Sequence, residues 1–423
     1  MSVRRPSHRT AWFALVALAC LATACSSSSS STSAQSGSAA ATSNPACTGA
    51  PLNFTSIATL SGPIAVQSIV AETKNATNAA VKAVNDECAL GRPINVQLCD
   101  DKGDPNEAQT CGREAKDNGS IALFGSSGQF DTGTTAAGLP GVMTQGGTLF
   151  DLTNASSFSS SSGLTLVVGG AGAAAAAGVK ESLMVAVDTA ASRAFVGIAQ
   201  QIAQNDGVTM DALYVPADTT DWAPVAAQAS ERKPGSIGVI LPLPVPFLTA
   251  LSAEGITAKD IPIFSAVTLM SPELLKQLGS TADGMYLLTQ TAPPSDKDNP
   301  GIQQMLKEMK DAGFDANGDD LSPASTAAWT DVHGLVDILK KMPAADVAAL
   351  DSTKLVAAMQ AAGPISRPEA ATFDFSKPAF PDIQSLAGFR IFSRDAMVVR
   401  VQDGHYVRAS SFSDATQPFK LDS

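Results

Sequence analysis

Positive charge and histidine are both scarce in this sequence of 423 residues. Lys and Arg number 28 against 40 Asp and Glu, which gives a formal net charge of −12. A protein that neutralises nucleic-acid phosphates needs clustered Lys and Arg, so this balance excludes a general nucleic-acid binder. There are 3 His residues, and no GxSxG elbow or HExxH helix is present. The chain is therefore not predicted to be an enzyme.

Long apolar runs are missing from the chain after its N-terminal segment. No later segment approaches the ~20 apolar residues of a membrane span. Residues 1–24 instead have the features of a secretory signal peptide: three arginines, a short apolar run and small residues before Cys25. The stretch ending at Cys25 resembles a bacterial lipobox, although Leu21 stands four residues before the cysteine instead of three. We expect Cys25 to be lipidated and to anchor an extracytoplasmic protein to the cell membrane. Cys20 is a second possible site, and plain secretion is the alternative.

Apolar residues make up 44% of the chain and charged residues 16%, which is typical of a compact globular protein and excludes a wholly disordered one. The exception is the segment 25–46, which is dominated by Ser, Ala, Thr and Gly. Such a stretch cannot bury enough apolar surface to fold, so we expect a flexible tether. The remaining length is sufficient for two domains.

Four cysteines follow the tether, and an even count in an exported protein indicates disulfides. Cys47 precedes the first expected strand and Cys88 ends the helix that returns beside it, so both lie at one sheet edge. Cys99 ends the second strand and Cys111 lies early in the next helix, at the opposite edge. Of three possible connectivities, this argument favours Cys47–Cys88 and Cys99–Cys111. A zinc site is the alternative, but no CxxC pair is present.

Expected strands and helices alternate in two successive runs. The first begins with a strand at 52–59, a helix at 64–87 and a strand at 93–98, followed by a helix at 105–118 with Asp104 as its N-cap. The second follows an apolar stretch at 164–168, with a helix expected at 171–183 and a strand at 184–187. Strands that alternate with helices of this length predict parallel sheets covered by helices, and two runs predict two Rossmann-like lobes.

This pattern resembles the type I periplasmic binding proteins, specifically the branched-chain amino-acid receptor family. The resemblance rests on LSGP at 60–63, VQLCDDKGDPNE at 96–107, IALFGSS at 121–127, YVPADTTDWAP at 214–224 and ADGMY at 282–286. It implies a monomeric receptor that delivers a small molecule to ABC permease subunits. It also implies two lobes, 47–168 plus 292–368 and 169–291 plus 369–423, joined by crossovers near 168–170, 288–293 and 368–372. A lipid-anchored sensor that uses the same fold without transport is the alternative.

The resemblance also implies a ligand site beyond the carboxyl ends of the strands. In the first lobe, the family's hydroxyl and backbone contacts to a ligand carboxylate correspond to two short polar loops. In the second lobe, the position of an acid that would hold an ammonium falls near Val267 and Thr268, with no carboxylate close by, so a ligand without a free ammonium is expected. The implied ligand-binding residues are Ser61, Ser126, Ser127, Gly128, Gln129, Gly146, Gly147, Thr148, Phe195, Val267 and Thr268.

No cofactor or metal is expected. The segment 170–175, with Asp188 beyond it, imitates a dinucleotide fingerprint, but Ala-rich helix starts often produce such matches. Asp315, Asn317 and Asp319 imitate the start of a calcium loop, but Thr326 stands where its bidentate Glu is required. His333 lies in an apolar helix and is interpreted as a packed side chain. Trp329, in the same helix, is interpreted as either a core residue or a residue of the cleft.

Overall fold

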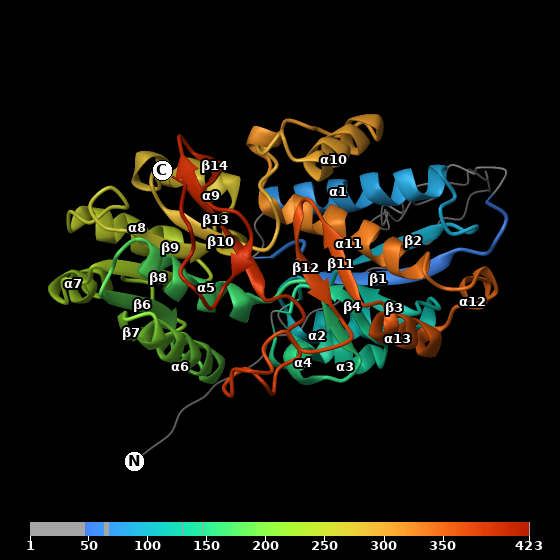
Figure 1. Ribbon diagram of the computed structural model, residues 1–423, viewed down its shortest axis with the longest axis horizontal. Helices are drawn as coiled ribbons and strands as arrows, with labels where there is room; N and C mark the ends of the chain where they lie inside the picture. The colour runs from blue at the N-terminus through green and yellow to red at the C-terminus, as the bar shows by residue number, and fades with distance from the viewer. Residues whose placement is uncertain (1–46, 63–66, 129, 147, 423) are drawn as a thin grey trace, which may run out of the picture. The chain divides into compact units, whose positions relative to one another are not determined.

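The computed structural model describes residues 47–62, 67–128, 130–146 and 148–422 (Figure 1). These residues form two large β-sheets flanked by helices, and one short two-stranded sheet. The predicted α/β fold with two lobes is confirmed, because each lobe is organised around one of the large sheets. None of the described helices is both long enough and apolar enough to cross a membrane.

Sheet A, in the first lobe, is parallel in all its described pairings and has the order β2-β1-β3-β4-β5. Helices α1 and α11 cover one face, and α2 and α3 cover the other (Figure 1). The strands are β1 (Leu52–Ala58), β2 (Ile94–Asp100), β3 (Ala122–Phe124), β4 (Gly141–Thr144) and β5 (Ser157–Ser159). The helices are α1 (Gln67–Asp86), α2 (Pro105–Asp117), α3 (Asp131–Ala137), α4 (Leu149–Thr153), α10 (Pro300–Asp311), α11 (Pro323–Leu339), α12 (Ala344–Ala348) and α13 (Ser352–Ala361).

Sheet B, in the second lobe, has the order β14-β13-β10-β9-β8-β6-β7, with β15 beside β13. Strands β6 to β10 pair in parallel, and β13 and β14 add antiparallel pairings. The strands are β6 (Glu181–Val187), β7 (Thr209–Val215), β8 (Ser236–Ile240), β9 (Ile263–Ala266), β10 (Tyr286–Thr289), β13 (Asp395–Gln402), β14 (His405–Arg408) and β15 (Ser413–Asp414). The helices are α5 (Gly163–Ala176), α6 (Ala190–Asn205), α7 (Ala223–Glu231), α8 (Pro244–Ala253), α9 (Pro272–Leu278) and the 3-10 helix η1 (Val267–Leu269).

Strand β6 shows why the central strands have continuous apolar runs. Leu183 and Val185 are buried in one hydrophobic cluster, whereas Met184 and Ala186 are buried in another. Successive side chains of a strand point to opposite faces, and here helices cover both faces. Almost every position of the strand is therefore apolar.

The two lobes repeat one strand order. Strands β6 to β10 of sheet B follow the sequence 7-6-8-9-10, which has the same pattern as 2-1-3-4-5 in sheet A. The carboxyl ends of equivalent strands are therefore followed by equivalent loops in each lobe. These loop ends are where ligands of parallel α/β proteins bind.

Helix α2 begins where the sequence predicts. The Asp104 side chain accepts hydrogen bonds from the backbone N–H groups of Asn106 and Glu107, at 2.7 and 3.2 Å. Pro105 occupies the first helical turn, where no N–H donor is needed. The predicted N-cap is confirmed.

Helix α5 corrects the expected elements between 164 and 183. The stretch 164–168 is already helical, and the helix ends at Ala176 rather than continuing to 183. Ten of its 14 residues are buried, so the polar stripe that identifies a surface helix is missing. Gly178 then adopts a positive φ of 74°, and β6 starts at Glu181. The expected crossover at 168–170 falls inside α5.

The other two expected crossing segments run side by side. Thr291 and Ala370 form an antiparallel bridge, and the Ala371 N–H donates to the Gln290 carbonyl at 2.9 Å. The Gln290 side chain links further segments: its Oε1 accepts from the Ser162 N–H at 2.7 Å, and its Nε2 donates to the Asp395 carbonyl at 3.1 Å. Gln290 therefore joins segments that are far apart in the sequence. Nearby, β11 (Pro364–Arg367) and β12 (Ala370–Asp374) form the two-stranded sheet.

Both disulfides match the predicted pairing. Cys47 is bonded to Cys88, and Cys99 is bonded to Cys111, with Cα–Cα distances of 5.4 and 5.7 Å. One bridge lies where β1 begins and α1 has ended, and the other joins the end of β2 to α2. The argument from sheet edges thus holds for both.

Candidate functional site

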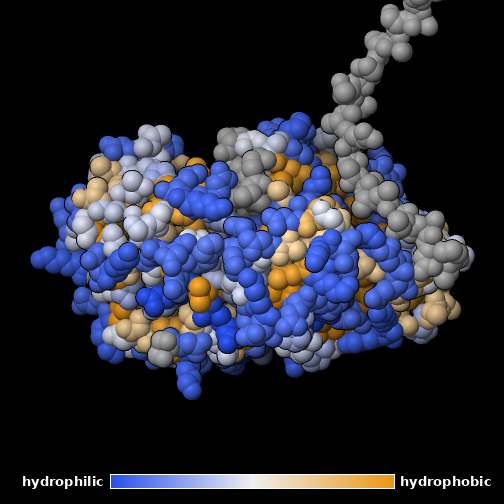
Figure 2. Space-filling model, turned by 90° about the horizontal axis from the view of Figure 1, so that it is seen from above, coloured by the Kyte–Doolittle hydropathy of each residue, from blue (hydrophilic) through white to orange (hydrophobic). Residues whose placement is uncertain are grey.

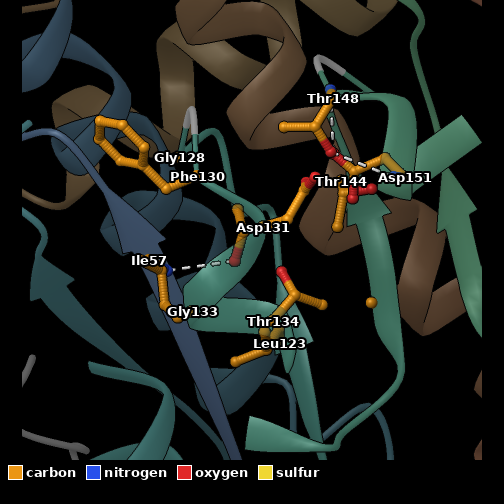
Figure 3. Close-up of a pocket in the computed structure, with 12 residues that line it drawn as sticks. Ile57, Leu123, Gly128, Phe130, Asp131, Gly133, Thr134, Thr144, Thr148 and Asp151 are labelled. Carbon is orange, nitrogen blue, oxygen red and sulfur yellow. Dashed lines mark hydrogen bonds between the residues drawn. The ribbon is translucent and has the colours of Figure 1, made fainter. Parts of the chain in front are cut away.

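A small polar cavity lies at the carboxyl ends of β1, β3 and β4 in the first lobe (Figure 3). Its volume is about 20 Å³, which is above the minimum that a cavity needs to hold a water molecule. The lining residues are Ile57, Leu123, Ser126, Gly128, Phe130, Asp131, Gly133, Thr134, Gly141, Thr144, Thr148 and Asp151. Three of the predicted site residues, Ser126, Gly128 and Thr148, are among them.

Thr148 and Asp151 form a capping box at the start of α4. The Thr148 hydroxyl accepts from the Asp151 N–H at 3.1 Å, and Asp151 Oδ2 accepts from the Thr148 hydroxyl at 3.0 Å and its N–H at 3.4 Å. Such a box satisfies donors at a helix start that would otherwise need another acceptor. The Thr148 hydroxyl and N–H are thus already engaged within the chain, which weakens its predicted role as a donor to a ligand carboxylate.

The cavity is acidic. Burial raises the pKa of Asp151, the hydrogen bonds from Thr148 oppose this, and the negative charge of Asp131 raises it further. Asp131 is exposed and occupies the first position of α3. Its carboxyl points toward Thr144 and Asp151 (Figure 3). Two carboxyl groups from neighbouring helix starts therefore share this small volume.

A bulge in β4 fixes the direction of Thr144. The register of β4 against β5 shifts between Val142 and Thr144, and Met143 has a positive φ of 52°. A bulge gives the strand an extra residue and re-aims the side chain that follows, here Thr144. Gly334 of α11 makes room for Met143, because a Cβ there would lie 2.9 Å from the Met143 methyl carbon. Strained backbone of this kind is typical of functional sites.

Ser126 is held at the edge of the cavity by β1. The Ile57 N–H donates to its hydroxyl oxygen at 3.1 Å, so the hydroxyl proton is available for an acceptor in the cavity. Ser127 is exposed, and its N–H donates to the Ile57 carbonyl at 3.2 Å. Gly128 approaches the residue that follows β2, since a Cβ on Gly128 would lie 3.0 Å from Asp101 Oδ2.

Ser61 and Gly146 lie near the same strand ends but do not line the cavity. The Ser61 hydroxyl donates to Asp100 Oδ2 at 2.5 Å, which joins the loop after β1 to the end of β2. Gly146 is buried with a positive φ of 48°, and a Cβ on it would lie 2.7 Å from the Ser161 carbonyl. Both residues shape the loops. Predicted residues Gln129 and Gly147, together with Cys25, lie outside the described residues.

The three predicted residues of the second lobe do not line the cavity. Val267 is 5% exposed and belongs to the hydrophobic core, whereas Thr268 beside it is exposed. Phe195 packs on a second core cluster from within α6. No role beyond this core packing is observed for Val267 or Phe195.

Sequence reasoning missed Asp131, Thr134, Thr144 and Asp151, which supply most of the polar lining. One signal was present: Thr148-x-x-Asp151 is the spacing of a capping box, which marks a helix start. The other residues carried no signal, because their direction depends on the bulge in β4 and on how α3 packs.

The cavity lies where parallel strands end, in a fold with two α/β lobes. This arrangement is typical of a ligand-binding protein. The chain belongs to the periplasmic binding protein family, whose sequence profile matches residues 51–405. The predicted resemblance is thereby confirmed, and the fold is that of the type I periplasmic binding proteins. Among curated proteins, none matches the sequence.

Solved structures of solute-binding proteins share the fold. A solute-binding protein of an ABC transporter from R. palustris, in complex with benzoate, is 16% identical with a TM-score of 0.65, and covers 88% of this chain and 98% of its own. A leucine-binding protein from Thermotoga maritima MSB8 is 14% identical with a TM-score of 0.66, covering 86% and 99%. A fatty acid ABC transporter substrate-binding protein from Thermomonospora curvata is 16% identical with a TM-score of 0.68, covering 88% and 95%.

Proposed function

We propose that this chain is an extracytoplasmic solute-binding lipoprotein that captures a small organic metabolite and delivers it to the permease subunits of an ABC importer. The observation that carries the proposal is the polar cavity at the carboxyl ends of β3 and β4, in a chain of the periplasmic binding protein family. The working unit is a monomer of two lobes, 47–168 plus 292–368 and 169–291 plus 369–423. Lipidation of Cys25 would hold it at the cell membrane.

Exposed leucines support a ligand with an apolar body. Leu149 is 52% exposed in the first turn of α4, and Leu243 is 48% exposed at the start of α8. They follow β4 and β8, so each lobe presents one leucine beside the strand ends where ligands bind. The face drawn in Figure 2 is largely hydrophilic, with hydrophobic residues in patches. The benzoate, leucine and fatty acids in the descriptions of the structural relatives also carry apolar bodies.

A thermal-shift screen of small metabolites tests the proposal. A ligand that binds only the folded chain adds about 2.7 kcal/mol of stability at 100 times its Kd, so the melting temperature must rise. Calorimetry on each hit then gives its stoichiometry, which we expect to be one. A broad metabolite set that leaves the melting temperature unchanged would argue against a solute receptor.

A further inference from the structure

Helix α5 begins with backbone donors that have no acceptor. Its N-cap is Ser162, and the first turn continues with Gly163, Leu164 and Thr165. Within the described residues, the N–H groups of these three residues donate no hydrogen bond. Leu164 and Thr165 are 0% and 1% exposed, so bulk solvent does not reach their N–H groups. Buried N–H groups without an acceptor are rare in native proteins and need a partner.

Two serine hydroxyls at this helix start give a second, independent observation. Ser162 and Ser393 are 3% and 2% exposed, and neither hydroxyl makes a hydrogen bond with a described residue. The backbone of Ser162 is extended, with φ of −143° and ψ of 125°, and an N-cap side chain of this kind lies beside the N–H groups of the first turn. Ser393 lies against the same turn, because the Thr165 hydroxyl donates to its carbonyl oxygen at 3.4 Å. Unpartnered buried hydroxyls are costly and are commonly satisfied by a bound group.

The helix start is both fixed in place and open to a ligand. Gln290 Oε1 accepts from the Ser162 N–H at 2.7 Å, which holds the N-cap. Gly163 is exposed, and no neighbouring group lies within 4 Å of the place of a Cβ on it. A small group can therefore approach the buried donors from the side of Gly163.

The electrostatic surroundings favour a negative charge. A helix N-terminus carries positive partial charge and is a natural site for anions. The carboxyl of Asp331 is hydrogen-bonded with Ser160, two residues before the N-cap, and burial raises its pKa to about 8. It is therefore mostly uncharged at neutral pH and repels an anion little. Burial also raises the pKa of Asp395, whose carbonyl accepts from Gln290 Nε2 at 3.1 Å.

We infer that the start of α5 binds a small anion, with the N–H groups of the first turn and the hydroxyls of Ser162 and Ser393 as donors. A carboxylate group, either free or part of a larger solute, has the required chemistry. Helix α5 follows β5 of sheet A and packs on sheet B, so the anion would lie where the chain passes from one lobe to the other. None of these residues lines the cavity of the first lobe. The site is thus separate from that cavity and does not depend on the proposed function.

Calorimetry in a chloride-free buffer tests the inference with hexanoate, hexanamide and acetate. Hexanoate and hexanamide have the same shape and differ in charge, so we expect hexanoate to bind at least about tenfold more tightly. Acetate distinguishes the two sources of the carboxylate: equal binding of acetate and hexanoate indicates a free anion, and tighter binding of hexanoate indicates a solute with an apolar body. Hexanamide binding as tightly as hexanoate overturns the inference, and so does failure of both acids to bind.

Ser162→Ala is the main variant, because the hydroxyl that it removes makes no bond within the described fold. It should weaken the binding of both acids about tenfold. Ser236→Ala, which removes a buried serine hydroxyl at the start of β8, is the matched control and should leave the binding unchanged. Gly163→Pro removes one N–H donor at a position where a helix tolerates proline, since the preceding Ser162 is extended. It should weaken the binding as well.

Melting temperatures of the variants show that each one folds. Acids that bind Ser162→Ala and Gly163→Pro as tightly as the wild type would bind elsewhere, which overturns the inference. The proposed function fails separately. If the acids bind through Ser162 and no other solute of the broad screen binds, the anion site stands and the solute receptor does not. If other solutes bind and both acids fail, the receptor stands and the anion site is wrong.

Discussion

Glu72 of α1 and Ser322, the N-cap of α11, are joined by two hydrogen bonds. The Ser322 N–H donates to Oε2 at 2.6 Å and the Ser322 hydroxyl donates to Oε1 at 2.5 Å. Glu72 is 6% exposed. Burial raises its pKa to about 7, although both bonds from Ser322 oppose the shift. The charge of Glu72 also raises the pKa of Tyr406, after the larger effect of burial. A carboxyl group therefore titrates near neutral pH where the helices meet.

Stability should fall as the pH rises toward 7. Between about pH 4.5 and 7, the folded chain keeps a proton on Glu72 that the unfolded chain has released. The slope of the unfolding free energy against pH is then negative. Glu72 accounts for a loss of about 3 kcal/mol of unfolding free energy across this window. In Glu72→Gln, the amide oxygen can still accept from the Ser322 N–H, and the amide NH2 can donate to the Ser322 hydroxyl in place of the bond that this hydroxyl donated. The variant should reduce the slope by about 1.4 kcal/mol per pH unit.

Urea unfolding at several pH values measures this slope. It does not vanish in the variant, because burial also raises the pKa of Asp331 to about 8. The exposed change Asp298→Asn serves as a control and should leave the slope as it is. An identical slope in wild type and Glu72→Gln would show that Glu72 does not titrate here.

Gln290→Ala should destabilise the fold by about 1–3 kcal/mol. The substitution leaves the buried Ser162 N–H and the Asp395 carbonyl without their partner. Gln303→Ala removes an exposed glutamine that also bonds a carbonyl, and its effect should stay within about 0.5 kcal/mol. Chemical denaturation compares the two, and similar effects would mean that Gln290 has no special role.

Gly112→Ala should cost about 1–3 kcal/mol through overpacking. A Cβ on Gly112 of α2 would collide with the backbone of Gly133 in α3. Backbone atoms, unlike a flexible side chain, cannot rotate out of the way. Gly163→Ala is the matched control, because no atom lies within 4 Å of the added carbon and its φ is not positive. The control should be neutral or slightly stabilising. Melting curves of both variants decide, and a harmless Gly112→Ala would contradict the close packing of α2 on α3.

Cys25→Ala should move the protein from the membrane fraction to the soluble exported fraction. A lipid attached at Cys25 would be the anchor that the substitution removes. Fractionation of cells followed by immunoblotting measures the change, with Cys20→Ala as the control. Release by Cys20→Ala and retention of Cys25→Ala would place the lipid on the earlier cysteine.

Local patterns were sufficient to predict much of the fold. Asp104 followed by Pro105 has a direct physical meaning as a helix start, and that prediction is confirmed. The two disulfides followed from the geometry of a strand and the helix after it. Helix α5 was misplaced because a helix buried on nearly all sides has no polar stripe.

The site was harder to predict than the fold. Asp131 and Asp151 are ordinary residues of helix starts, and nothing local shows that their carboxyls share a cavity. Their proximity depends on the crossing of α2 with α3 at Gly112 and on the left-handed backbone of Met143. These are long-range packing effects, and one sequence does not display them.

The Cys47–Cys88 bridge determines where mechanical load would enter the folded protein. Cys47 stands just before β1, an inner strand of sheet A between β2 and β3. A pull arriving along the chain at residue 47 is shared covalently with Cys88, just beyond α1. The load then acts along a helix packed on α11, and β1 is not peeled from its neighbours one hydrogen bond at a time. A receptor dragged by its own membrane attachment would keep sheet A, and the cavity at its far edge, intact.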